Sequence, residues 1–215
     1  MTEFHLIVPT LENYYRGIIL FGDNTATYKF ALGKTLLELA TKQDDFISLE
    51  ELAEPFSAHL VQHLTHSPKQ ITRSSNGKFL DACDQYKRDE ITKDQLISST
   101  VKLGFVNVID AFHKVNGEDI EKRFYIDERK TNKGIRLTDE LHKLVIDRDG
   151  INLTPEIESR WRLVETAWDL KLSSSIIDVG HDAETNTLIV NQNNRRKVIT
   201  SSRDALNGYQ RGKCF

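Results

Sequence analysis

Residues 154–170 read TPEIESRWRLVETAWDL, and this stretch is the clearest helix of the sequence. Thr154 is suited to cap the helix, and Pro155 occupies the first helical position, where a missing N–H costs nothing. The apolar side chains recur at helical spacing and share one face: Ile157, Trp161, Val164 and Trp168. Tryptophans on such a face belong to a core far more often than to a ligand site. The stretch therefore predicts a long helix packed onto other helices.

Helical periodicity also dominates the N-terminal side of this stretch. Apolar side chains between Tyr28 and Ala40 recur at three- and four-residue spacing and predict a second core helix. Residues 48–51, SLEE, and 92–95, TKDQ, have the capping-box pattern, so a helix is expected to follow each. Pro55 is expected to kink or split the first of these helices. A further short helix is expected over residues 106–115.

Two pairs of β-rich segments interrupt the helices. Residues 123–126 and 134–137 flank a polar turn and predict a hairpin, and residues 175–179 and 187–190 predict a second one. A short helix is expected from Thr138. The predicted fold is mainly α with two small β-hairpins, an α+β chain built as a helical bundle. Helices followed by a hairpin favour a winged-helix-like arrangement within it.

The chain is expected to divide into three regions. Residues 1–148 form a helix-rich N-terminal region with one hairpin, and residues 149–200 carry the tryptophan helix and the second hairpin. The seam between them is placed in the loop at residues 147–153. Residues 201–215 are expected to be a basic lead-in, with a short helix, to a further domain.

The composition excludes several classes of protein. The 215 residues are 39% hydrophobic and 28% charged, which is enough apolar content for a core. The net charge is only −3, so a nucleic-acid partner would have to be met by a local patch. Cys83 and Cys214 do not suggest a disulfide scaffold. The N-terminus lacks a signal-peptide pattern and no apolar run is long enough to span a bilayer, so we expect a cytoplasmic protein with no membrane partner.

Three histidines recur at i, i+4 and i+7, namely His59, His63 and His66. On a continuous helix they share a face, and two of them could bind a metal. The zincin pattern requires a glutamate where Leu60 stands, so the general base of that family is missing. A solvated or partner-facing histidine face is the preferred interpretation. It leaves open that the chain is a protein-interaction module, docking a subunit of a defence complex or a second copy of itself.

The segment FYIDERK, residues 124–130, resembles half of a metal-dependent nuclease motif. In that motif acidic residues hold magnesium and a lysine steadies the attacking water. Glu128 and Lys130 supply this half, and Asp110 is the available upstream acid. The alternative function is therefore a metal-dependent nuclease that uses Asp110, Glu128 and Lys130 as catalytic residues. An ordinary charged hairpin turn is the preferred interpretation of the same residues.

The C-terminal 25 residues reverse the charge of the chain. Between Asn191 and Phe215 only Asp204 is acidic, and the net charge of the segment is +5. Such a segment suits a polyanion, because neutralised phosphates release counterions. A second candidate phosphate contact is Arg73, in a polar loop before a helix. We expect these side chains to bind DNA: Arg73, Arg195, Arg196, Lys197, Arg203, Arg211 and Lys213.

The last 17 residues, ITSSRDALNGYQRGKCF (199–215), resemble the lead-in to the catalytic domain of HNH endonucleases. In that family a short helix with a Leu-x-x-Tyr-x-x-x-Cys pattern precedes a Cys-x-x-Cys pair. Upstream pieces are similar to the N-terminal region of a bacterial group of HNH proteins. These pieces are TYKFAL (27–32), SLEELA (48–53), KFLDAC (78–83), VIDAFH (108–113) and RWRLVETAW (160–168).

The resemblance implies a ββα-metal catalytic domain in which a histidine activates water and a divalent metal stabilises the cleaved phosphate. Paired cysteines in that domain hold a structural zinc. Cys214 would be the first metal-binding cysteine, with its partner expected beyond Phe215. We therefore expect the DNA-binding or DNA-positioning region of a restriction or phage-defence HNH endonuclease. On this interpretation the 215-residue chain holds no catalytic residue and no cofactor, and is inactive alone.

Overall fold

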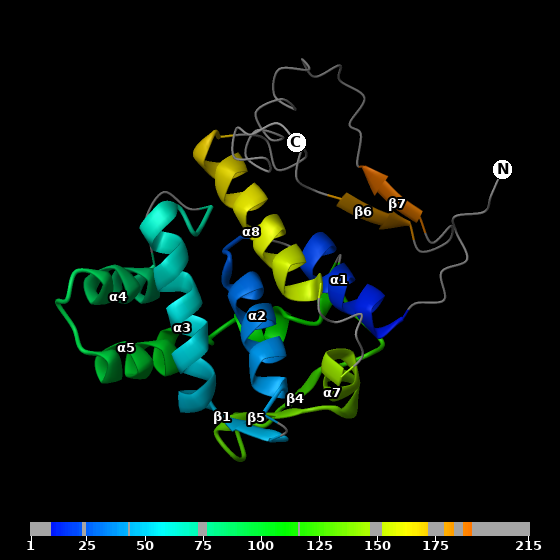
Figure 1. The fold of residues 1–215 in the computed structure, drawn as a ribbon, viewed down its shortest axis with the longest axis horizontal. Coiled ribbons are helices and arrows are strands. Elements are labelled where there is room, and N and C mark those ends of the chain that lie inside the picture. Colours follow the sequence, from blue (N-terminus) through cyan, green and yellow to red (C-terminus); the bar gives the residue numbers. More distant parts are fainter. Residues whose placement is uncertain are drawn as a thin grey trace.

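The structure, a computed structural model, describes residues 10–22, 25–42, 44–72, 77–115, 117–146 and 152–171. It also describes the backbone of a strand pair within residues 179–190. The fold is mainly helical, with a small three-stranded antiparallel sheet and two-stranded hairpins, as the α+β prediction states (Figure 1).

The helices are α1 (Leu11–Phe21), α2 (Tyr28–Ala40), α3 (Leu49–His66), α4 (Lys78–Lys87), α5 (Lys93–Ser99), α6 (Val108–Ala111), α7 (Asp139–Ile146) and α8 (Leu153–Asp169). A π-helical turn, η1 (Thr100–Gly104), continues α5. The strands are β1 (Phe46–Ser48), β2 (Lys114–Val115), β3 (Glu118–Asp119), β4 (Tyr125–Asp127), β5 (Gly134–Leu137), β6 (Val179–Asp182) and β7 (Thr187–Val190). No helix within the described ranges is long and apolar enough to cross a bilayer.

A continuous cluster of buried side chains runs through the described residues from Tyr15 in α1 to Trp168 in α8. The predicted stripe of α8 faces this core, and Trp161 is fully buried. Helix α2 lies between α3 and α8 and packs against both (Figure 1). At Gly33 the chain comes close to α1, because the Tyr15 hydroxyl donates a 2.6 Å hydrogen bond to the Gly33 carbonyl. The tryptophan helix is therefore packed into the same core as the N-terminal helices.

Capping boxes set the starts of two helices as predicted. Ser48 accepts from the Glu51 N–H and Glu51 returns a bond to the Ser48 N–H, and Thr92 and Gln95 repeat the arrangement at α5. The expected split at Pro55 is wrong, since α3 continues through it to His66. Burial of the same helix outweighs the local cost of proline, as α3 places the fully buried side chains of Leu52, Phe56 and Leu60 in the core.

The segment after α5 departs from the prediction. The expected helix over residues 106–115 is confined to α6, and the chain then forms β2, which pairs with β3. Helix α8 begins at Leu153 with Asn152 at its N-cap, so Thr154 lies inside the helix and is not the cap. Differences of one or two residues at helix ends are common, whereas the β2–β3 pair is a change of element type.

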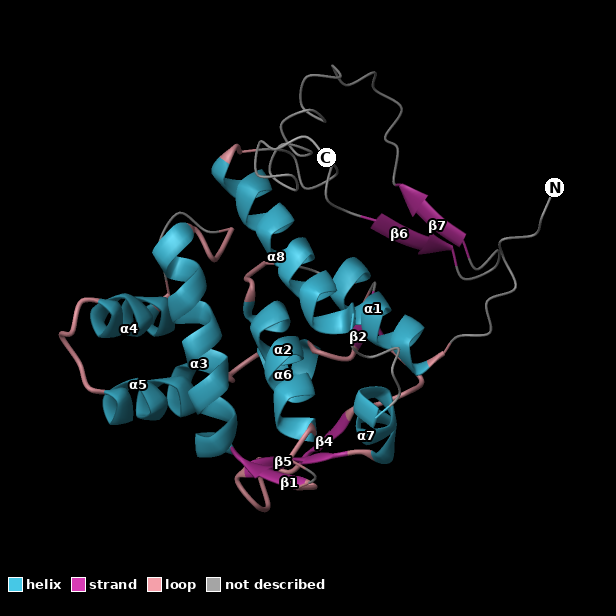
Figure 2. Cartoon of the chain, in the orientation of Figure 1, coloured by secondary structure: helices cyan, strands magenta, loops and turns pink. Residues whose placement is uncertain are grey.

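The three-stranded sheet has the order β1-β5-β4, with both pairs antiparallel. The predicted hairpin is β4–β5, and β1 is an additional strand that ends at Ser48, the N-cap of α3. Gly134 sits opposite Ser48, and a Cβ there would collide with the Ile47 carbonyl and the Phe46 ring. Figure 2 shows the sheet lying across the lower ends of α2 and α3, with one face turned away from the helices.

The second hairpin is the pair β6–β7. Its second strand matches the predicted range, and its first strand covers Val179–Asp182, shifted toward the turn from the expected 175–179. The seam predicted at 147–153 falls mostly on residues outside the described ranges, as does the helix predicted after residue 200.

Candidate functional site

The turn of the β4–β5 hairpin is fastened to the helices by one arginine. The Arg129 guanidinium donates to both carboxylate oxygens of Asp127, to Asp110 of α6 at 2.7 Å, and to the Phe105 carbonyl at 3.1 Å. These bonds hold the pKa of the Asp127 carboxyl below its usual value. Arg129 therefore positions the hairpin against the end of η1 and against α6.

A second arginine organises the outer face of the same hairpin. Arg136 donates to Glu128 at 2.7 Å, and Asn132 donates to the same carboxylate at 2.6 Å. The pKa of Glu128 is lowered, first by Arg136 and then by Asn132. The Arg136 guanidinium also lies 5.7 Å from the centre of the Phe46 ring on β1. Through Arg136, the hairpin is therefore tied to the additional strand β1.

The predicted nuclease residues do not share a partner. Asp110 is paired with Arg129, Glu128 is paired with Arg136, and the Lys130 side chain is exposed. Carboxylates that share a metal must converge on one point, whereas here each turns to its own guanidinium. Within the described residues, no three histidine, cysteine, aspartate or glutamate side chains are grouped to hold a metal.

The internal ion pairs leave two lysines at the tip of the hairpin. Lys130 and Lys133 are both exposed, and neither forms an ion pair with another described residue. Lys133 has a φ of 56°, a left-handed conformation that the tight turn requires. The tip therefore presents positive charge on a turn whose base is fixed by Arg129 and Arg136.

The histidine triplet lies on α3 as its spacing predicts, but the three side chains have different environments. His66 is exposed, and His59 is partly buried with its Nε2 atom 3.3 Å from Glu38. Burial lowers the pKa of His59 to about 4, so it is neutral at ordinary pH. His63 is only 5% exposed, because α8 covers it. The expected solvated face is therefore closed at its centre by the chain itself.

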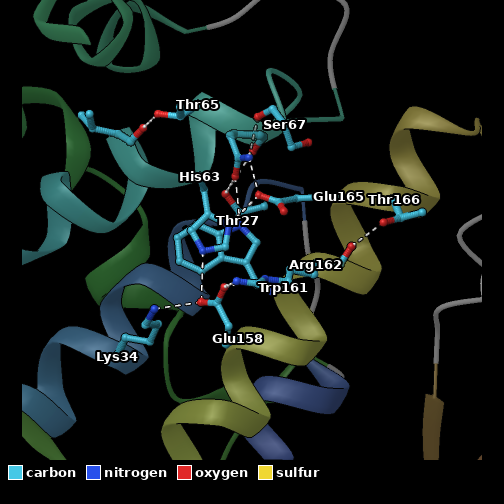
Figure 3. A network of polar contacts seen from close by, with 12 residues as sticks. Thr27, Lys34, His63, Thr65, Ser67, Glu158, Trp161, Arg162, Glu165 and Thr166 are labelled. Atoms are coloured by element: carbon cyan, nitrogen blue, oxygen red, sulfur yellow. Dashed lines mark hydrogen bonds and ion pairs between the residues drawn. The ribbon is translucent and has the colours of Figure 1, made fainter. Parts of the chain in front are cut away.

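His63 is held between two carboxylates of α8 (Figure 3). Its Nδ1 atom lies 2.7 Å from Glu165 and its Nε2 atom 3.2 Å from Glu158. The imidazole stacks on Trp161 with ring centres 3.5 Å apart and planes 3° from parallel. A carboxylate accepts hydrogen bonds, so a ring that faces one at each nitrogen carries a proton on both. The geometry describes an imidazolium.

Gln70 links this histidine to the rest of the core. Its amide nitrogen donates to Glu165 at 2.5 Å, and its carbonyl oxygen accepts from Thr27 at 2.5 Å and from the Trp161 indole at 3.0 Å. Thr27 is the N-cap residue of α2. The Gln70 side-chain amide therefore links α2, the end of α3 and α8, and both its nitrogen and its oxygen form hydrogen bonds.

Glu158 has two further cationic partners. It accepts from Lys34 of α2 at 2.8 Å and from Arg162, one turn along α8, at 2.6 Å. The hydrogen bond from His63 is the first cause of a pKa for Glu158 far below its usual value, followed by that from Lys34. For His63 burial lowers the pKa, but the hydrogen bonds to Glu158 and Glu165 outweigh it and the pKa is raised.

A cavity of about 280 Å³ lies beside the cluster, between the ends of α3 and α8. His63, His66, Glu165 and Asp169 are among the residues that line it. Neither nitrogen of His63 is free to accept a proton from a ligand, because both already donate to carboxylates. The cluster is therefore suited to holding the two helices together.

Sequence reasoning placed Trp161 in the core but did not find its polar partners. Glu158 and Glu165 stand seven residues apart on one face of α8, with Trp161 between them, and this spacing was the available signal. The predicted phosphate contacts lie outside the described residues, as does Cys214. Those contacts are Arg73, Arg195, Arg196, Lys197, Arg203, Arg211 and Lys213. Comparison of the chain with protein-family models, with curated proteins and with solved structures found no match in any of the three.

Proposed function

We propose that this chain binds and positions DNA as the helix-rich region of an HNH-type endonuclease. The observation that carries the proposal is the strand order β1-β5-β4, with β1 placed between helices α2 and α3. Apart from the short β2–β3 pair, the chain runs through helix, strand, further helices and a hairpin whose second strand pairs with the first strand. This is the arrangement of a winged helix. The order thus supports the winged-helix-like fold expected from the sequence.

In a winged-helix-like arrangement the β4–β5 turn is the wing. Its base is fixed by Arg129 to α6 and η1, and its tip carries Lys130 and Lys133. A rigid turn with two exposed cations suits the phosphate backbone, because little side-chain or backbone order has to be gained on binding. The fixed base and the charged tip together favour DNA contact over an ordinary surface turn.

The basic C-terminal segment adds to the same proposal. The segment has a net charge of +5, so its basic side chains would contribute several phosphate contacts in addition to those of the wing. Residues 199–215 resemble the lead-in to an HNH domain, so in this proposal catalysis, its divalent metal and a structural zinc belong to a following domain. Cys214 would be the first zinc ligand of that domain.

The test measures how binding of the 215-residue chain to a DNA duplex depends on salt concentration, with fluorescence anisotropy as the readout. We expect the logarithm of the binding constant to fall linearly with the logarithm of salt. Replacing both wing lysines, Lys130→Gln with Lys133→Gln, is expected to reduce the slope by about 2, because two phosphates would no longer be neutralised.

The matched control is Lys171→Gln. Lys171 is also exposed and also has a positive φ, 54°. It follows α8, and the C-terminal end of this helix lies away from the sheet (Figure 1). Its replacement is expected to leave the slope unchanged. Binding that is absent, or indifferent to salt, would contradict the proposal. Magnesium-dependent cleavage by the chain that is abolished in Glu128→Ala would favour the metal-dependent nuclease instead.

A further inference from the structure

We propose that His63 is a pH-sensitive latch, which fastens the C-terminal half of α8 to α3 while its imidazole is doubly protonated and releases it when one proton leaves. The latch is formed by the imidazole, the two carboxylates that flank it and the indole it stacks on (Figure 3). It does not depend on DNA binding and would hold if the proposed function failed.

Loss of one proton turns an attraction into a repulsion. The shorter bond, from Nδ1 to Glu165, is the one that a neutral imidazole would keep. The Nε2 lone pair would then face the Glu158 carboxylate across 3.2 Å, with like partial charges opposed. His63 is almost fully buried, so the two groups are poorly screened from each other except on the side of the adjoining cavity. Moving α8 away from α3 relieves the contact.

Other charged groups also lie around the ring, on α2, α3 and α8. Lys34 and Arg162 both pair with Glu158, and Lys34 helps to lower the pKa of this carboxyl. His59, one turn earlier on α3, is neutral because its pKa is about 4, and its Nε2 atom lies 3.3 Å from Glu38. His66 and Asp169 line the adjoining cavity, and both side chains are exposed to solvent.

The two halves of α8 are held by different contacts. Arg16 of α1 binds Glu156 at 2.7 Å and Lys34 binds Glu158, so the first half is joined to α1 and α2 by ion pairs that involve no histidine. Beyond Trp161 the polar contacts of α8 with other described elements are those of Glu165 with His63 and Gln70, and a 3.4 Å bond from Lys69 to the Trp168 carbonyl. The repulsion arises at Glu158, but Lys34 and Arg16 hold that half of the helix. It is therefore relieved by movement of the second half, where the remaining bond to Glu165 is the contact that gives way.

The direction of the pH effect follows from the raised pKa of His63. A histidine whose folded pKa exceeds its usual 6.5 contributes stability that is full below pH 6.5 and is lost as pH rises through the folded value. Between these two values the opening equilibrium of the helix end should rise by up to about tenfold per pH unit, since one proton is released. Glu158 has the opposite pH dependence, because its folded pKa is depressed. Its contribution to stability is full above about pH 4.5 and is lost as pH falls below that value.

The experiment combines NMR with hydrogen exchange on the full chain. The His63 ring proton is titrated by NMR, and a pKa above 6.5 is expected. Exchange of a peptide from residues 161–169 is followed from pH 6 to pH 9 and divided by that of a peptide from α4 to remove the intrinsic rate change. We expect this ratio to rise with pH in the wild type.

Two variants separate the latch from general instability. Glu158→Gln keeps the size of the side chain but offers an amide to neutral Nε2, so the pH dependence of the ratio should be largely lost and the pKa of His63 should fall. His66→Gln removes the exposed histidine of the same helix and should leave both readouts unchanged. A wild-type pKa of 6.5 or lower, or an exchange ratio that is flat with pH, would overturn the proposal.

Discussion

At the scale of residues, a few polar side chains decide how α8 sits on the core. His63, Gln70 and Glu165 are buried, and each has hydrogen-bond partners in the others or in Trp161. A satisfied buried network adds specificity, whereas a half-satisfied one costs the full desolvation of each orphaned group. Removing one member should therefore cost more than a single net hydrogen bond.

The replacement Trp161→Phe tests this network at its apolar member. Phenylalanine keeps a ring against His63 and Phe30 but cannot donate to Gln70. We expect a loss of about 1–3 kcal/mol of unfolding free energy beyond that of the matched change Trp168→Phe. Trp168 is also buried, and its indole is not part of the network. Urea unfolding measures both, and equal losses would show that the Gln70 bond contributes nothing.

The histidine spacing illustrates how far the sequence reaches at this scale. Its i, i+4, i+7 pattern correctly places three rings on one face of a helix. It cannot show that His63 is covered, because the carboxylates that bind it lie 95 and 102 residues further along the chain. No local pattern connects residues so distant, so the site could be recognised only once α3 and α8 were seen packed together.

At the scale of elements, the two capping boxes were reliable guides, whereas the single cap expected at Thr154 and the very short strands were not. The boxes at Ser48 and Thr92 satisfy backbone N–H groups within four residues, so the pattern contains the whole interaction. Strand β1 has three residues and β2 has two, which is too short for an alternating pattern to be visible. Their pairing depends on partners that the fold supplies from elsewhere in the chain.

Helix α3 gives an element-scale prediction. Ser48→Ala removes the acceptor for the Glu51 N–H and should lower the free energy of unfolding by about 1 kcal/mol. Glu51→Ala removes the reciprocal bond to the Ser48 N–H. Because the two bonds form one box, the double variant should lose less than the sum of the single losses. Chemical denaturation of the four proteins checks this, and strict additivity would contradict it.

At the scale of the whole molecule, the first and the last described helices, α1 and α8, belong to one core. Tyr15 of α1, Ile135 of β5 and Trp161 of α8 belong to the same buried cluster. The boundary expected near residue 148 came from local loop composition, which does not report what a later helix packs against. Packing of α8 onto α2, on the other side of that loop, depends on an apolar stripe that fits helices more than 100 residues earlier.

The extent of the core allows folding and the proposed DNA binding to be tested separately by shortening the chain. The buried cluster of the described residues ends at Trp168, so a chain that stops at Lys171 retains all of its members. We expect it to fold cooperatively with a melting temperature close to that of the 215-residue chain. A small loss is expected because β6, which lies beside α1, is removed. Circular dichroism during heating measures this.

The shortened chain should bind DNA in a different way. It lacks the six basic residues between Asn191 and Phe215 and keeps the wing lysines, so its salt slope should fall by up to about 5, leaving about 2 from Lys130 and Lys133. If the slope is unchanged, the C-terminal cations do not touch phosphate and the wing side of the molecule supplies the contact. If binding disappears, the wing alone cannot hold a duplex, and the basic segment becomes the main DNA-binding element of the proposal.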